Sequence, residues 1–174
     1  MKIRKGTISD APRLAEVHVR SWQKAYRGLI PDDYLDGLDA DIERREGVFR
    51  EAAEAPSEQG SLFVAEEDGK VVGFVWAGPT QDEDAKDRGV IGEIWSMYVH
   101  PSHWGEGAGK VLQSRAMEDL KEHGFREAIL WVLDSNERTR RWYERQGWHP
   151  DGATKRDDRA DFVLNEVRYR RALT

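Results

Sequence analysis

Residues 98–112 read YVHPSHWGEGAGKVL, and this stretch contains the most informative loop of the chain. The residues before the loop are typical of a strand, and the residues after it continue as a helix. Gly105, Gly107 and Gly109 alternate within the loop, and Lys110 follows them. Free backbone amides and the positive end of the helix dipole meet at a helix N-terminus, so a glycine-rich turn at this place predicts an anion-binding site.

Two common kinds of phosphate-binding loop do not fit the spacing of these glycines. A P-loop has the pattern G-x-x-x-x-G-K-[ST], but Trp104 stands five residues before Gly109 and Val111 follows the lysine. The dinucleotide pattern G-x-G-x-x-G requires a glycine at Lys110 or at Leu112. The spacing therefore disfavours both nucleoside triphosphate hydrolysis and dinucleotide binding.

The composition limits the class of protein further. The chain has 174 residues, of which 39% are hydrophobic and 34% charged, and this predicts one globular domain over residues 1–174. The net charge of −6 argues against nucleic acid binding. The lack of cysteine excludes disulfides, thiolate metal sites and a thiol nucleophile. We expect a cytoplasmic protein with no membrane segment, because MKIRKGTISD has no apolar run and no stretch approaches about 20 apolar residues.

Periodicity and turn signals predict the order of the elements. We expect helices over 10–28, 31–38, 41–54, 109–123 and 136–146. We expect strands over 2–5, 61–67, 70–78, 90–99, 128–133 and 162–171. The remaining segments are a turn over 55–60, a DG hairpin at 68–69, a polar loop over 81–89 and a DG turn at 151–152 before the last strand. The sum is a mixed α/β (α+β) domain with helices on a mostly antiparallel sheet that has at least one crossover.

A second block, LWVLDSNERTRRWYERQGW at 130–148, completes a family pattern. Together with residues 98–112 it resembles the GNAT superfamily of N-acetyltransferases, whose strand ending in V-x-P leads into Q/R-x-x-G-x-G/A and a helix, followed later by a loop asparagine and FY-E-x-x-G-F. The resemblance covers residues 61–149. It implies a GNAT-like fold with a central mixed, mostly antiparallel twisted sheet of about seven strands flanked by helices. Trp104 departs from the pattern, because the family usually has Gln or Arg there.

The resemblance implies acetyl-CoA as the co-substrate. A Cβ would hold the backbone away from phosphate oxygens, so glycines suit a loop that binds the CoA pyrophosphate. The pantetheine arm is expected between the backbone of Met97 and Val99 on one side and Asn136 on the other. Residues expected to bind the pyrophosphate are Gly105, Glu106, Gly107, Ala108, Gly109 and Lys110. Arg138, Arg140 and Arg141 are candidate helpers, with a solvated helix face as the alternative and the favoured one for each of them.

Acetyl transfer to an amine needs a base, because an amine is protonated at neutral pH. Glu93 is the candidate base, since it is a carboxylate within an apolar strand and the family often has an acidic residue at this place. The alternative is that Glu93 points to solvent. Tyr143 matches the tyrosine that commonly protonates the leaving thiolate in the superfamily, and it is also expected to contact the cofactor. The alternative is that Tyr143 is a core aromatic on a helix. The Val99 amide is a candidate oxyanion donor.

The first two helices flank the acceptor groove in this superfamily, so aromatic residues there and in the central strand are candidates for substrate binding. These are Trp22, Tyr26 and Trp95, with core packing as the alternative and the favoured one for Trp22. His100 and His103 have a spacing that suits a metal, but a third ligand is lacking and we expect no metal. An alternative role for His103 is that of a base or of a phosphate contact.

The function implied is transfer of the acetyl group from acetyl-CoA to a primary amine of a small molecule, an amino acid or a peptide, by direct attack in a ternary complex. One alternative is a non-catalytic acyl-CoA-binding or regulatory module of the same fold. Another is a phosphate- or nucleotide-binding regulatory protein. A homodimer is an open expectation, because superfamily members are often dimers.

Overall fold

The computed structural model describes residues 1–56, 59–86, 89–159 and 161–174. Residues 57–58 of the predicted turn and residues 87–88 of the predicted polar loop therefore lie outside the described residues.

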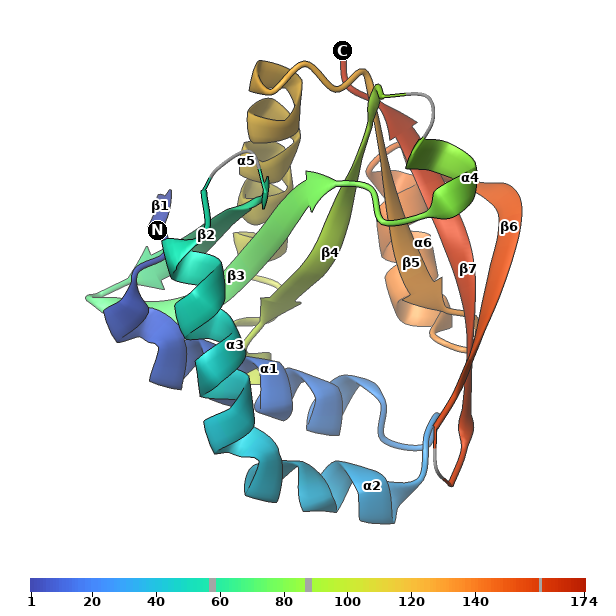
Figure 1. The fold of residues 1–174 in the computed structure, drawn as a ribbon. Coiled ribbons are helices and arrows are strands. Elements are labelled where there is room, and N and C mark those ends of the chain that lie inside the picture. Colours follow the sequence, from blue (N-terminus) through green and yellow to red (C-terminus); the bar gives the residue numbers. More distant parts are fainter. Residues whose placement is uncertain (57–58, 87–88, 160) are drawn as a thin grey trace.

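A seven-stranded sheet of order β1-β2-β3-β4-β5-β7-β6 forms the centre of the molecule (Figure 1). Neighbouring strands are antiparallel except β4 and β5, which are parallel, so the predicted mixed and mostly antiparallel sheet is confirmed. The strands are β1 (Lys2–Lys5), β2 (Ser61–Glu67), β3 (Lys70–Pro79), β4 (Ile91–Val99), β5 (Glu127–Leu133), β6 (His149–Asp158) and β7 (Val163–Ala172).

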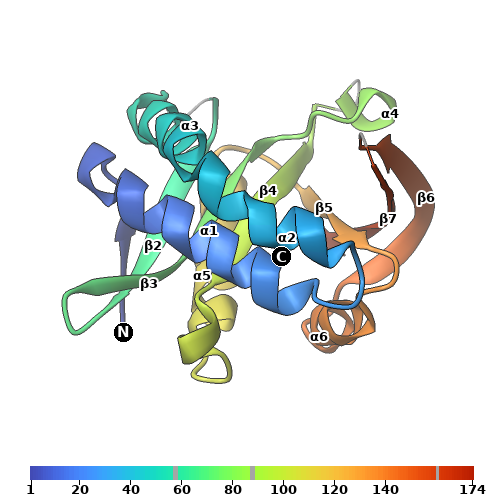
Figure 2. The ribbon, with the colours of Figure 1, turned by 90° about the horizontal axis from the view of Figure 1, so that it is seen from below.

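Helices cover both faces of the sheet, as Figures 1 and 2 show. On β2, Leu62 and Val64 pack with α1 and α3, whereas Phe63 and Ala65 pack with α5. This division follows from the alternation of side chains along a strand. The helices are α1 (Ala11–Ala25), α2 (Asp32–Gly37), α3 (Ile42–Glu54), α4 (Glu83–Lys86), α5 (Ala108–Glu122) and α6 (Glu137–Arg145).

The structure corrects the prediction in two segments. Residues 149–158 form β6, and the DG pair at 151–152 lies inside this strand instead of forming a turn before the last strand. Gly152 has φ +90°, and the pairing with β7 is irregular between Pro150 and Thr154. The strand was missed because an edge strand with solvent-exposed polar residues lacks the apolar alternation that predicts a strand. The predicted polar loop over 81–89 also contains the short helix α4.

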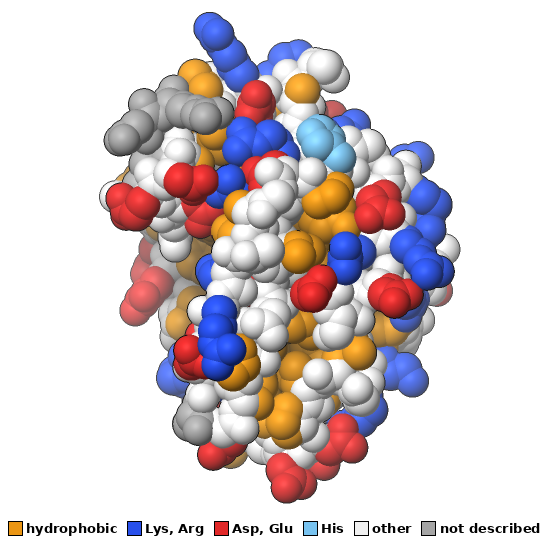
Figure 3. All heavy atoms as spheres, turned by 90° about the vertical axis from the view of Figure 1, so that its right-hand side faces the viewer, with side chains coloured by type: hydrophobic (Ala, Val, Ile, Leu, Met, Phe, Trp, Pro, Cys, Tyr) orange, Lys and Arg blue, Asp and Glu red, His pale blue; other side chains and the backbone are white. Residues whose placement is uncertain are grey.

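The edge strand β6 carries several charged side chains near its end, including Lys155, Arg156, Asp157 and Asp158. Figure 3 shows the side of the molecule that lies on the right in Figure 1, where blue and red side chains surround the orange hydrophobic ones. Charges on an edge strand discourage pairing with the strand of another chain.

The feature that positions the site is the separation of β4 from β5. The two strands pair only at Ile91, Gly92 and Glu93, opposite residues 127–129, although both strands continue beyond this point. A β-bulge lies just beyond the last of these pairs, because Trp76 pairs with Ser96 and Ala77 with Ile94, so the register with β3 shifts at Trp95. The strand ends therefore leave a gap in the middle of the sheet.

Candidate active site

A cavity of about 820 Å³ lies at the gap between β4 and β5. Both strands contribute to its walls, and so do the glycine loop before α5 and residues of α1 and α6. Among the described residues, cations outnumber acids on the cavity wall. One carboxylate lines it, Glu137, and the cations that line it are Lys24, Arg27, Lys110, Arg138 and Arg145. In a protein with a net charge of −6, this local excess of positive charge suits an anionic ligand.

The glycine loop forms the anion-binding end of this cavity. Gly105 and Gly107 have φ values of +86° and +90°, a conformation that side chains with a Cβ rarely adopt. Gly107 is the N-cap of α5, and its carbonyl accepts the Lys110 and Val111 amides at 3.1 and 3.2 Å. Ala108 and Gly109 are the first two residues of α5, so their amides have no carbonyl acceptor within the helix. The loop therefore presents free donors at the positive end of α5.

The loop residues predicted to bind a cofactor do not all lie on the cavity wall. Gly105, Gly107, Ala108, Gly109 and Lys110 line the cavity. The Glu106 carboxylate instead contacts Nδ1 of His103 at 2.9 Å, so Glu106 offers a ligand only its backbone amide.

His103 also lies close to a second carboxylate. Its Nδ1 is 3.6 Å from Glu67, and the ligand atoms of Glu67, His103 and Glu106 lie within 4.8 Å of one another. His100 points elsewhere, with its Nδ1 2.6 Å from the hydroxyl of Ser102. The two predicted histidines are thus not brought together as ligands of one site.

Trp104 closes the loop against the strand. Its indole N–H donates to the Val99 carbonyl at 2.7 Å, and the Ser21 hydroxyl donates to the same oxygen at 2.9 Å. The guanidinium of Arg138 lies 4.4 Å from the centre of the indole ring. Trp104 therefore anchors the loop to β4 and provides a flat surface for a cation from α6.

The free edge of β4 presents backbone groups to the cavity. The His100 amide donates to the Val72 carbonyl of β3 at 2.8 Å. Backbone groups alternate in direction along a strand, so Met97 and Val99 point away from β3 and toward the gap. Because the Val99 carbonyl is already occupied, Val99 offers the cavity an N–H donor only.

Asn136 and Tyr143 face this edge from α6, and both line the cavity. Asn136 is the N-cap of α6, where its Oδ1 accepts the Thr139 amide at 3.2 Å, and this leaves its Nδ2 hydrogens as donors. Tyr143 is buried, and its ring lies 5.0 Å from Trp142 and 5.9 Å from Trp148. Burial raises the pKa of the Tyr143 hydroxyl, and the neighbouring Tyr98 adds to this effect. Tyr143 therefore holds its proton at neutral pH.

Glu93 is buried, with 7% of its surface exposed, and the cavity wall begins at the next residue, Ile94. Its Oε2 accepts the Thr80 hydroxyl at 3.1 Å and the Gln81 amide at 2.9 Å. Burial raises the pKa of the Glu93 carboxyl, while the bond from Gln81 opposes this rise. The alternative that Glu93 points to solvent is therefore wrong.

The three aromatic residues predicted for the acceptor occupy different places. Tyr26 and Trp95 line the cavity, whereas Trp22 packs beside the cluster of Val19 and Leu35. The prediction did not include Tyr98, which lines the cavity. Burial raises the pKa of the Tyr26 and Tyr143 hydroxyls, and Tyr98 raises both further. Register gives the signal for Tyr98, because it lies between the two residues whose backbone faces the gap.

Comparison with known proteins identifies the family. Residues 18–148 match the acetyltransferase (GNAT) family. An uncharacterized N-acetyltransferase YuaI of Bacillus subtilis is 31% identical over 134 residues, which cover 77% of this chain and 72% of that protein. A spermidine N(1)-acetyltransferase of Thermoplasma acidophilum is 25% identical over 167 residues, covering 95% and 96%.

A solved structure with the same fold is the PaiA N-acetyltransferase of Thermoplasma acidophilum in complex with coenzyme A. Its TM-score is 0.76 at 21% identity, and the match covers 98% of both chains. The family model and the relatives named N-acetyltransferases show an acyltransferase. This chain belongs to the acetyltransferase (GNAT) family.

None of the described helices is long and apolar enough to span a membrane.

Proposed function

We propose that the protein transfers the acetyl group of acetyl-CoA to a primary amine of a small molecule, an amino acid or a peptide, within one N-acetyltransferase domain over residues 1–174. The observation that carries this proposal is the cavity between β4 and β5, with the amides of the glycine loop at one end and Tyr143 on its wall. Family membership and the CoA complex of PaiA support acetyl-CoA as the co-substrate.

The residues of the cavity fit acetyl-CoA. The amides of residues 105–109 and the cations Lys110 and Arg138 suit its phosphates. The N–H groups of Met97 and Val99 suit the pantetheine amides from one side, and Asn136 Nδ2 does so from the other. When bound, acetyl-CoA supplies a thioester as the acetyl donor.

Glu93 is the general base in this proposal. An amine attacks only after losing its proton, and a carboxylate whose pKa is raised by burial takes up a proton more readily than an exposed one. Both hydrogen bonds reach Oε2, so Oε1 is left as the acceptor. Since Glu93 lies next to the cavity wall and not on it, we place a water between the carboxylate and the amine.

Tyr143 is the general acid. Its hydroxyl has no hydrogen-bond partner within the described part of the chain, and it keeps its proton at neutral pH. A hydroxyl in this position is ready to protonate a departing thiolate. The Val99 N–H is a donor for the oxygen that becomes negative during attack.

The acceptor enters, in this proposal, at the side of the cavity formed by Tyr26 and Trp95. A relative named spermidine N(1)-acetyltransferase supports an amine as the acceptor. Trp22 is a supporting residue behind Tyr26, because the two rings are in edge contact at 4.9 Å. A cytoplasmic location and a homodimer stay predictions.

The test uses the absence of cysteine from the chain. A thiol reagent added to the protein, acetyl-CoA and an amine reports only the CoA that is released. We expect release that depends on both protein and amine, with an equal amount of acetylated amine by mass spectrometry. CoA binding without release across amino acids, peptide N-termini, polyamines and small alkylamines would instead support a non-catalytic module. Tighter binding of ATP than of CoA would support a nucleotide-binding regulator.

A further inference from the structure

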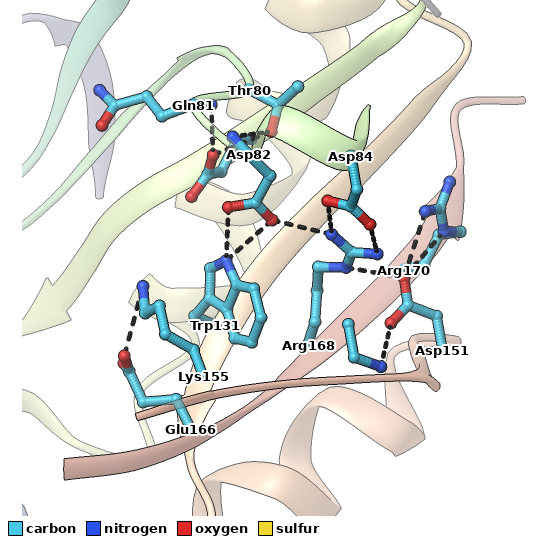
Figure 4. Close-up of polar contacts among 12 residues, drawn as sticks. Thr80, Gln81, Asp82, Asp84, Trp131, Asp151, Lys155, Glu166, Arg168 and Arg170 are labelled. Atoms are coloured by element: carbon cyan, nitrogen blue, oxygen red, sulfur yellow. Dashed lines mark hydrogen bonds and ion pairs between the residues drawn. The ribbon is translucent and has the colours of Figure 1, made fainter. Parts of the chain in front are cut away.

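Arg168 of β7 is the centre of a polar network beside the active site. Only 5% of its surface is exposed, and it contacts three aspartates. Its Nη1 lies 2.9 Å from Asp82 and 2.8 Å from Asp84, and its Nε lies 2.8 Å from Asp151 (Figure 4). A buried guanidinium with this many partners keeps its neighbours in fixed places, because losing one would leave a buried charge unpaired.

The network holds in place the segment of residues 80–84, which comprises the connection after β3 and the first two residues of α4. Asp82 accepts the indole N–H of Trp131 at 3.1 Å as well as the bond from Arg168. The Asp82 amide donates to Thr80 Oγ1 at 3.1 Å. Because Trp131 belongs to β5 and Arg168 to β7, the segment is attached to two strands of the sheet.

The same segment supplies both hydrogen bonds to Glu93. The Thr80 hydroxyl and the Gln81 amide reach Oε2, so the position of the segment decides whether the carboxylate has donors. The register of the sheet brings Glu93 and Arg168 close together. Glu93 pairs with Ile129 of β5, and Arg168 pairs with Trp131 of the same strand. Residues 129 and 131 lie on the same face of β5.

The charges near Glu93 come from two other elements. Burial is the largest cause of the raised pKa of the Glu93 carboxyl. Asp82 raises this pKa further, and Lys155 on β6 lowers it. The positive charge of Arg168 lies beside the Asp82 carboxylate and offsets its negative charge, which limits how far Asp82 raises the pKa of Glu93.

We propose that Arg168 is a positioning residue for Glu93: its ion pairs with Asp82 and Asp84 hold residues 80–84 so that Thr80 and Gln81 keep donating to the Glu93 carboxylate. The inference rests on the proposed function, in which Glu93 is the base. Arg168 acts through the segment and touches no reacting atom.

The test compares three variants. Arg168→Met removes the charge at similar length, and Thr80→Val removes one donor while leaving the ion pairs of Arg168 in place. Arg170→Met is the matched control, because Arg170 lies on the same strand and pairs with Asp151 and Glu127 but donates no hydrogen bond to residues 80–84 in the described structure. Circular dichroism and urea unfolding establish that each variant is folded.

Two readouts are measured as a function of pH. One is kcat/KM, and the other is the carbon-13 resonance of the Glu93 carboxyl, assigned by its loss in Glu93→Gln. We expect Arg168→Met to raise the pKa of the Glu93 carboxyl by about one pH unit, in the pH profile of kcat/KM and in the carbon-13 titration alike. The value of kcat/KM then falls about tenfold at acidic pH and recovers at higher pH. Thr80→Val should raise the same pKa by a smaller amount in both readouts, and Arg170→Met should leave it unchanged.

The inference is wrong if a folded Arg168→Met titrates like Arg170→Met, or if it loses activity equally at every pH. If Arg168→Met does not fold, a Thr80→Val variant that titrates like Arg170→Met overturns the inference. The carbon-13 titration separates this failure from failure of the proposed function. A wild-type protein that acetylates no amine overturns the function, while the shift at Glu93 is still measured without turnover.

Discussion

Arg138 is the cation of the cavity that we expect to contribute most to CoA binding. Its guanidinium lies 4.4 Å from the Trp104 ring and has no carboxylate partner among the described residues. The neighbouring arginines of α6 are engaged, Arg141 with Glu137 at 3.0 Å and Arg140 with Asp134 at 3.0 Å. A phosphate therefore meets Arg138 without first having to break an ion pair.

The size of the effect follows from this arrangement. A hydrogen bond to a charged group contributes about 1.5–3 kcal/mol, and the lower value applies because Arg138 is exposed to solvent. A loss of about 1.4 kcal/mol is tenfold in Kd. We expect Arg138→Ala to weaken CoA binding about tenfold.

Isothermal titration calorimetry with CoA and with dephospho-CoA measures this directly. Arg141→Ala is the control, since it removes an arginine of the same helix that does not need to contact the ligand. A tenfold loss for CoA but not for dephospho-CoA assigns the contact to the 3′-phosphate, and an equal loss for both assigns it to the pyrophosphate. If Arg138→Ala binds CoA as tightly as Arg141→Ala, the reasoning is refuted.

Three further outcomes test the chemistry, the glycine loop and the core. Tyr143→Phe should lower kcat about a hundredfold with little change in the Kd of CoA, because a general acid acts only in the transition state; equal losses of kcat and affinity would count against this role. Gly107→Val should instead raise that Kd, since a β-branched residue disfavours φ +90° and displaces the loop amides, and an unchanged Kd by calorimetry would contradict the anion site. Burial, followed by the charge of Arg45, lowers the pKa of His18 to about 3. The unfolded chain therefore takes up a proton first as the pH falls, and the free energy of unfolding drops by about 1.4 kcal/mol per pH unit below the ordinary value of 6.5. Urea unfolding of the wild type and His18→Gln at about pH 7.5 and about pH 5 checks this, and a constant difference between the two proteins would exclude it.

Local sequence was enough to predict the anion-binding end of the site. Gly105, Gly107 and the start of α5 follow one another in the chain, so strand, turn and helix could be predicted from neighbouring residues. Asn136 and Tyr143 came from a second short block, and the structure places both on the cavity wall. Their joint position was implied only by the family resemblance.

Contacts between distant segments could not be predicted in this way. Arg168 and Asp82 are 86 residues apart, and no periodicity links them. The role of Trp104 depends on the Val99 carbonyl, which only the geometry of the loop brings to the indole. The strand β6 was missed because its polar residues carry no apolar pattern, and its pairing with β7 is a property of the folded chain.

A crystal structure of the protein with CoA tests the central claim most directly. The account predicts the pyrophosphate within hydrogen-bond distance of the amides of residues 105–109, the pantetheine arm in the gap between β4 and β5, and the thiol next to the Tyr143 hydroxyl. CoA bound elsewhere, or with its thiol away from Tyr143 and Glu93, would contradict it.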